Sequence, residues 1–184
     1  DLAVSGEQIT SIGKVAVSSE REIDASGCWV MPGGVDPHAH VEQMSGMGVM
    51  NADTFETATM SAAMGGTTSV ISFAAQAKGQ DLADTVADYA ARARRGAMID
   101  YAFHMTVTDT SVPRFDDDLG DLIRAGHRSI KVFTTYNIQL SDCEILDTMA
   151  LARRHGALVC VHAENDAIIA RTKADLIAKG QLRP

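Results

Sequence analysis

Four side chains in this sequence have types and positions suited to metal binding: His38, His40, Lys131 and His162. His38 and His40 are separated only by Ala39, and in an extended segment side chains two residues apart point to the same face. Two imidazoles placed in this way can bind one metal ion, and zinc readily accepts imidazole nitrogen. Asp36, two residues before His38, is expected to orient a histidine by accepting its ring N–H. The alternative is a chance His-x-His pair with no metal.

Lys131 and His162 interrupt or end two later apolar segments. Lys131 lies in Ser129–Phe133, and an amine that points into a barrel is desolvated, which favours its neutral form. A neutral amine can react with carbon dioxide to give a carbamate, an anionic ligand able to bridge two cations. A lysine at the strand edge with its ammonium in water is the alternative. His162 ends Val159–His162, where a hydrogen-bonded core histidine is the alternative. His104, at a similar place in an earlier segment, is expected to be such a core residue.

The elements that must position these residues alternate between strand and helix from Trp29 onward. The first expected strand runs from Trp29–Met31 through Pro32–Gly34 to Val35–Val41, and the others are Thr67–Ala74, Tyr101–Thr108, Ser129–Tyr136 and Ala157–Glu164. The expected helices are Asp53–Met64, Asp81–Arg95, Asp116–Ala125, Ser141–His155 and Asp166–Lys179. Apolar strands that recur about every 30 residues, with a helix between them, predict parallel strands covered by helices. An eight-stranded barrel and an open doubly wound sheet are both compatible with this period.

Residues 1–31 form a different segment, which predicts the short strands Leu2–Val4, Gln8–Ile12, Val15–Val17 and Arg21–Ala25. This β element is too small to hold a core of its own. The sequence therefore predicts two parts, residues 1–31 and residues 32–184, the second with five βα units. The first residue is Asp rather than Met, and the chain stops at Pro184 soon after a helix, so both ends look cut.

Composition restricts the classes of function. The formal net charge is -8, which argues against nucleic acid as a partner because phosphate binding requires clustered Lys and Arg. Cys28, Cys143 and Cys160 form no CxxC pair, so neither a cysteine zinc site nor a disulfide framework is expected. A reduced, cytoplasmic location fits this cysteine usage. No apolar run approaches the length of a membrane span.

Three segments resemble those of a known enzyme family. Val30–His40 is similar to the first-strand signature of the amidohydrolase superfamily. Ser129–Tyr136 resembles the carboxylated-lysine strand of dihydropyrimidinases and hydantoinases, and Val161–Asn165 resembles their fifth strand. The likeness covers nearly the whole chain and keeps the order of the family.

The resemblance implies a TIM-type (β/α)8 barrel, of which five βα units are present, together with part of a small β-sandwich. It implies that His38 and His40 bind one divalent ion, that carboxylated Lys131 bridges two, and that His162 binds the second, with zinc as the expected metal. Tyr136 matches the tyrosine that polarises the scissile carbonyl. The implied reaction is hydrolysis of a cyclic amide C–N bond in a dihydropyrimidine or hydantoin by a metal-bridging hydroxide. The implied assembly is a homotetramer.

The chain also departs from the family pattern. The family supplies a further metal histidine from the sixth strand and an aspartate general base from the eighth, and both would lie beyond Pro184. The 184-residue piece is therefore expected to be inactive alone. Dihydroorotases carry an arginine two residues after the His pair, where this chain has Glu42. This difference argues against a dihydroorotase. An allantoinase-like ureide hydrolase stays an alternative. So does a non-catalytic assembly protein similar to the collapsin response mediator proteins, which resemble dihydropyrimidinases but have lost metal ligands.

Overall fold

The computed structural model describes residues 1–16, 18–46 and 48–181. By the contacts within the chain it divides into two compact units, Asp1–Pro32 and Gly33–Pro184. This division lies one residue from the boundary expected from the sequence. The candidate metal ligands all belong to the second unit.

The first unit contains an antiparallel ribbon of β1 (Leu2–Ser5) and β2 (Gln8–Ile12). None of its described residues is buried, in agreement with the expectation that it has no core of its own. The strand expected at Arg21–Ala25 is not formed. The chain there makes a local turn in which the Asp24 carboxylate accepts the backbone N–H of Ser26. Such local bonds compete with a strand ladder. Val15 and Ala16 are also outside any strand, and Val17 lies outside the described residues.

The second unit is built on a five-stranded parallel sheet. Its strands are β3 (Gly34–Ala39), β4 (Thr67–Ala75), β5 (Asp100–Thr106), β6 (Ser129–Phe133) and β7 (Leu158–His162). They follow one another across the sheet in chain order, and every neighbouring pair is parallel. A doubly wound sheet reverses its strand order at a switch point, whereas a barrel does not. The strand order is therefore that of a barrel wall.

A helix follows each strand, as predicted. The helices are α1 (Phe55–Met64), α2 (Leu82–Gly96), α3 (Phe115–Arg124), α4 (Asp142–His155) and α5 (Asp166–Ala178). Ser141 and Glu144 form a capping box at the start of α4. Gly96 is the last residue of α2. A Cβ on Gly96 would come within 2.8 Å of the Glu56 Cβ, so the missing side chain allows α1 and α2 to approach closely. Within the described ranges, no helix has the length and apolar character needed to cross a membrane.

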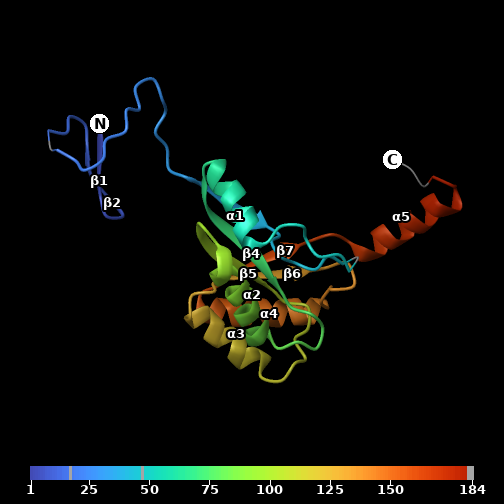
Figure 1. Ribbon diagram of the computed structural model, residues 1–184. Coiled ribbons are helices and arrows are strands. Elements are labelled where there is room, and N and C mark those ends of the chain that lie inside the picture. Colours follow the sequence, from blue (N-terminus) through green and yellow to red (C-terminus); the bar gives the residue numbers. More distant parts are fainter. Residues whose placement is uncertain (17, 47, 182–184) are drawn as a thin grey trace. The chain divides into compact units, whose positions relative to one another are not determined.

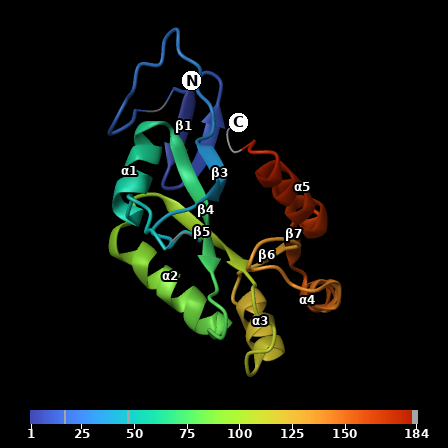
Figure 2. The same cartoon turned by 90° about the vertical axis from the view of Figure 1, so that its right-hand side faces the viewer.

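The hydrophobic core lies between the sheet and its helices, of which α2 to α4 cover one face (Figures 1 and 2), and Phe55 of α1 also belongs to it. Alternate strand residues, among them Phe103, Met105, Ile130 and Val132, are buried in this layer. They meet apolar residues of the helices, including Leu119 of α3, which is fully buried. Because strand side chains alternate between faces, the intervening residues belong to the opposite face of the sheet.

The edges of this sheet are β3 and β7. Helix α5 follows β7 and extends away from the sheet in Figure 1. It has no buried residue, and Ile168, Ile169, Leu176 and Ile177 are exposed along it. In a closed barrel, by contrast, every strand is paired on both sides.

The core packing predicts a large effect for Leu119→Ala in the full-length protein. Deleting a fully buried leucine side chain removes its transfer free energy and leaves a cavity, so the free energy of unfolding should fall by about 2–5 kcal/mol. A urea unfolding curve measures this as a lower midpoint. Leu146→Ala on α4 is the matched control, because Leu146 is 64% exposed, and its midpoint should barely move. Equal shifts for the two variants would contradict the proposed core.

Candidate metal centre

The His-x-His pair stands at the carboxyl end of β3. The ring centroids of His38 and His40 are 5.2 Å apart. Both rings contact Phe73 of β4: His40 stacks on it at 4.5 Å between centroids, and His38 meets its ring at 4.7 Å. The phenyl ring therefore supports both imidazoles from one side, so that fewer side-chain rotamers remain open to them.

Hydrogen bonds leave one ring nitrogen of His40 for a metal. His40 Nδ1 lies 2.7 Å from the side-chain carbonyl of Gln43. Because a carbonyl only accepts, Nδ1 carries the proton and Nε2 keeps its lone pair. Asp36 was expected to orient a histidine ring, and that expectation is wrong. Its carboxylate accepts the backbone N–H of His38 at 2.9 Å, because the side chain turns back along its own strand.

The electrostatic surroundings favour a neutral His38. The ring is still reached by solvent, but its partial removal from water lowers the pKa below the ordinary 6.5. The positive charges of His40, Lys131 and His104 lower this pKa further, and Asp36 opposes them. A neutral imidazole is the form that binds a metal. The influence of Lys131 also places its charge within electrostatic range of the His pair.

Lys131 lies in the middle of β6, half-buried between two fully buried residues, Ile130 and Val132, which face the helices. By strand alternation its side chain is on the opposite face of the sheet. Its neighbours in register are Thr106 on β5 and Cys160 on β7. The amine Nζ is 5.1 Å from the centroid of the Phe133 ring, which belongs to the same face.

His162 is the last residue of β7 and contacts residues other than those around the His pair. It is paired in register with Phe133, and their rings stack at 5.3 Å. His162 Nε2 is 2.6 Å from the Glu164 carboxylate, which also accepts a bond of 3.3 Å from the Tyr136 hydroxyl. With Nε2 taken by Glu164, Nδ1 is the nitrogen left for a metal.

Tyr136 and Glu164 change each other's proton affinity. The negative charge of Glu164 raises the pKa of the Tyr136 phenol above 10.0, with smaller contributions from burial and from their hydrogen bond. The hydrogen bond from His162 lowers the pKa of Glu164 below 4.5. Tyr136 has a positive φ of 71° and is 52% exposed. With this pKa the phenol is in its protonated form near neutral pH. The side chain extends from the loop after β6 into solvent.

The predicted ligands share one face of the sheet, but they form two groups. His38 and His40 lie together on β3, and His162 lies with Tyr136 on the β7 side, with Lys131 between them in strand order. In the part of the chain that the structure describes, no three His, Cys, Asp or Glu side chains come together as a metal site. Three imidazoles and one amine nevertheless fit zinc-type ions if the amine becomes a carbamate, because imidazole nitrogen and anionic oxygen are both zinc ligands.

Glu42 has a structural role that its position in the sequence did not reveal. It adopts a positive φ of 50°, and its carboxylate accepts the N–H of Phe55 at the start of α1 and pairs with Arg95 of α2. Its backbone carbonyl accepts a bond of 2.6 Å from Arg92. Glu42 therefore ties the loop after the His pair to two helices.

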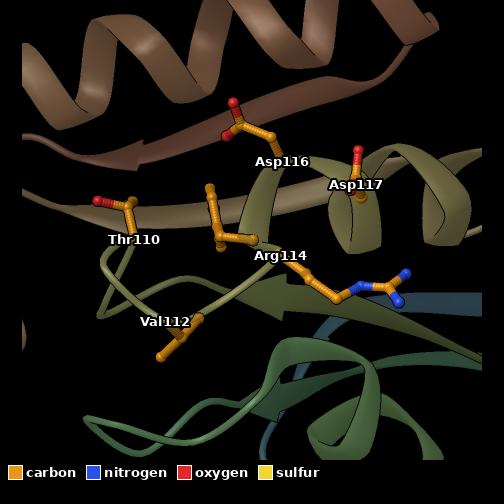
Figure 3. A pocket seen from close by; sticks show the side chains of 6 residues that line it. Thr110, Val112, Arg114, Asp116 and Asp117 are labelled. Carbon is orange, nitrogen blue, oxygen red and sulfur yellow. The ribbon is translucent and has the colours of Figure 1, made fainter.

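A shallow depression lies elsewhere, in the loop between β5 and α3. It has a volume of about 320 Å³ and is lined by Thr110, Val112, Arg114, Phe115, Asp116 and Asp117. Figure 3 shows the side chains of Arg114, Asp116 and Asp117 pointing in different directions rather than converging. None of the candidate metal ligands lines it, so we assign it no part in the chemistry.

Comparison with known proteins identifies the family. The profile of the amidohydrolase family matches residues 29–181. This chain belongs to the amidohydrolase family. A D-hydantoinase from Ralstonia pickettii is 39% identical over 186 residues, which cover 100% of this chain and 40% of that protein.

Solved structures of amidohydrolase relatives agree with the fold. Dihydropyrimidinase from Brevibacillus agri matches with a TM-score of 0.90 and 35% identity, over 100% of this chain and 40% of that one. A D-hydantoinase structure matches with a TM-score of 0.90 and 39% identity, over 97% of this chain and 39% of that one. The βα units are thus part of a TIM-type barrel, and the chain spans about 40% of the length of these relatives.

Three residues near the site were missed by the sequence reading: Gln43, Phe73 and Glu164. Glu164 could have been found, because it follows His162 by two residues, the same spacing that drew attention to the His pair. Phe73 gave no signal, since an aromatic residue in an apolar strand is ordinarily part of a helix-facing core. Gln43 follows a strand end, where only the loop conformation decides which side chains meet.

The contacts of Glu42 predict that Glu42→Ala destabilises the full-length protein. The change leaves the Phe55 N–H without its acceptor and removes the partner of Arg95, and bonds to charged groups are worth about 1.5–3 kcal/mol. The control is Glu42→Gln, which keeps an acceptor for Phe55 and should retain most of the stability. Urea unfolding midpoints measure both. A Glu42→Ala protein as stable as the unaltered one would mean that this tie is not needed.

Proposed function

We propose that the full-length protein hydrolyses the C–N bond of a cyclic amide, opening a dihydropyrimidine or hydantoin ring in a metal-dependent reaction. The observation that carries this proposal is the placement of His38, His40, Lys131 and His162 on one face of the sheet. In barrels of this class the carboxyl ends of the strands carry the chemistry. The relatives named D-hydantoinase and dihydropyrimidinase support the substrate class.

Each ligand has a separate role in this proposal. His38 and His40, supported by Phe73, hold the first divalent ion, and His162 holds the second through Nδ1. Lys131, if carboxylated by carbon dioxide, would supply an anionic oxygen ligand shared by the two ions. When bound, such ions lower the pKa of a water molecule and polarise a carbonyl group. Zinc is the metal expected for this ligand set.

Tyr136 is proposed to act on the substrate carbonyl. A phenol is protonated near neutral pH, and Glu164 raises its pKa further, so the hydroxyl that now donates to Glu164 can instead donate to an oxygen that gains negative charge. A donor of this kind contributes up to a few kcal/mol of transition-state stabilisation. Its exposed position after β6 leaves the hydroxyl accessible to a small molecule.

The 184-residue piece alone is proposed to be inactive. The ligands that it provides do not complete the second metal shell, and no described residue takes the place of the aspartate general base expected from the eighth strand. Cytoplasmic location, the homotetramer and the small cyclic amide or ureide as partner also stay predictions for the full-length protein.

Metal analysis and an activity assay of the full-length protein test the proposed function. We expect about two zinc ions per chain, ring opening of hydantoin or dihydrouracil, loss of activity with a chelator, and recovery with zinc. Ring opening of allantoin, without activity on hydantoin or dihydrouracil, would instead favour the allantoinase-like ureide hydrolase. A folded protein that binds no metal and opens no ring would instead favour the non-catalytic assembly protein.

A second test concerns the lysine. Lys131→Ala should lose at least about 100-fold in kcat, because removing the carbamate takes one ligand from both ions, and kcat should be partly restored by a short carboxylate such as acetate or propionate. Lys173→Ala on the exposed α5 is the matched control and should keep its activity. Full activity of Lys131→Ala without added carboxylate would rule out the bridging role.

A further inference from the structure

His104 of β5 is a buried histidine for which the proposed reaction has no use. Only 9% of its surface is exposed. Both of its ring nitrogens have partners on neighbouring elements: Nε2 is 2.8 Å from the backbone carbonyl of Pro37, and Nδ1 is 2.6 Å from the Ser129 hydroxyl. A single side chain thus joins β3 to β6, the strands that carry the His pair and Lys131.

The bond to Pro37 decides how the ring is protonated. A backbone carbonyl can only accept, so Nε2 must carry a proton and donate it. In the neutral ring, Nδ1 then accepts the hydroxyl proton of Ser129. The Ser129 hydroxyl and the Pro37 carbonyl therefore select one tautomer and one orientation of the His104 ring.

The carbonyl that His104 holds belongs to the peptide unit leading into His38. The N–H of that same peptide unit donates to the Asp36 carboxylate at 2.9 Å. The pairing of β3 with β4 is irregular between Asp36 and Ala39, so the ordinary ladder does not fix this stretch. Two side chains, Asp36 and His104, hold the two polar groups of the Pro37–His38 peptide instead.

We propose that His104 is a positioning residue that fixes the direction of the His38 and His40 side chains through the Pro37 carbonyl. This inference rests on the proposed function, since it assumes that the His pair binds a metal ion. The packing agrees with it: the ring of Phe73 contacts His104, at 4.9 Å between centroids, as well as the two ligand histidines. A turn of the Pro37–His38 peptide would move both imidazoles away from that support.

Two substitutions in the full-length protein separate positioning from simple packing. His104→Gln can place its amide N–H near the position of Nε2 and keep the bond to Pro37. His104→Asn is shorter, reaches only the position of Nδ1, and keeps the bond to Ser129 while losing Pro37. Each variant loses one of the two hydrogen bonds of a buried ring, so both should lower the thermal unfolding midpoint of the metal-free protein to a similar extent.

Zinc affinity should distinguish the two variants. Removing a group that orients a metal ligand costs about 10–100-fold in metal affinity, so we expect this loss for His104→Asn and a change within about 3-fold for His104→Gln. Competition with a chromogenic chelator measures the affinity. The visible absorption of the cobalt-substituted protein should change for His104→Asn and stay the same for His104→Gln. His155→Gln, at the carboxyl end of α4 beside Arg124, is the matched control and should leave both unchanged.

Failure of the positioning role can be distinguished from failure of the proposed function. Equal zinc affinities and equal cobalt spectra for the Asn and Gln variants would mean that His104 only packs. If His104→Asn does not fold, Ser129→Ala takes its place, because it removes the hydroxyl that holds the ring. That variant should lose up to about 10-fold in zinc affinity, the lower end of the range for groups that orient a metal ligand, and no loss would reject the proposal. If the unaltered protein binds no zinc, the proposed function itself fails.

Discussion

The alternation of side chains along parallel strands is the constraint on which the rest of this structure depends. Each strand of the barrel wall presents one row of residues to the helices and the other row to the opposite face. The helix-facing row is apolar and buried, as Ile130 and Val132 are on either side of Lys131. A one-residue slip in register would exchange the rows and send the lysine into the core. Burial of one face therefore fixes the position of the chemistry on the other.

Aromatic rings and hydrogen bonds refine that placement. Phe73 supports the His pair, and Phe133 stacks on His162 while lying beside the Lys131 amine. These two phenyl rings belong to the polar face, where they limit the movement of the candidate ligands without competing for a metal. Gln43 and Glu164 each hold one ring nitrogen of a histidine. The candidate site is thus prepared largely by residues that are not themselves ligands.

The loop that follows the His pair has its own support. Glu42 links it to α1 and α2, with a backbone conformation that glycine would adopt more readily. On the other side, the Pro37–His38 peptide is held by Asp36 and His104. The two histidines are therefore bounded on both sides by backbone that side-chain hydrogen bonds fix, in a strand whose ladder is irregular. Side chains here replace the restraint that regular pairing supplies elsewhere in the sheet.

Periodicity and spacing are local properties, so the sequence was sufficient to predict the alternation of strands and helices in the second unit and to single out candidate metal ligands by residue type. It could not choose between a barrel and an open sheet, because the order of strands depends on contacts between distant segments. It also did not reveal two local hydrogen bonds: Asp24 accepts the N–H of Ser26 where a strand was expected, and Asp36 accepts the N–H of His38. Only the tertiary structure brought Phe73, His104 and Ser129 to the candidate ligands, since they come from separate strands whose neighbours are set by folding.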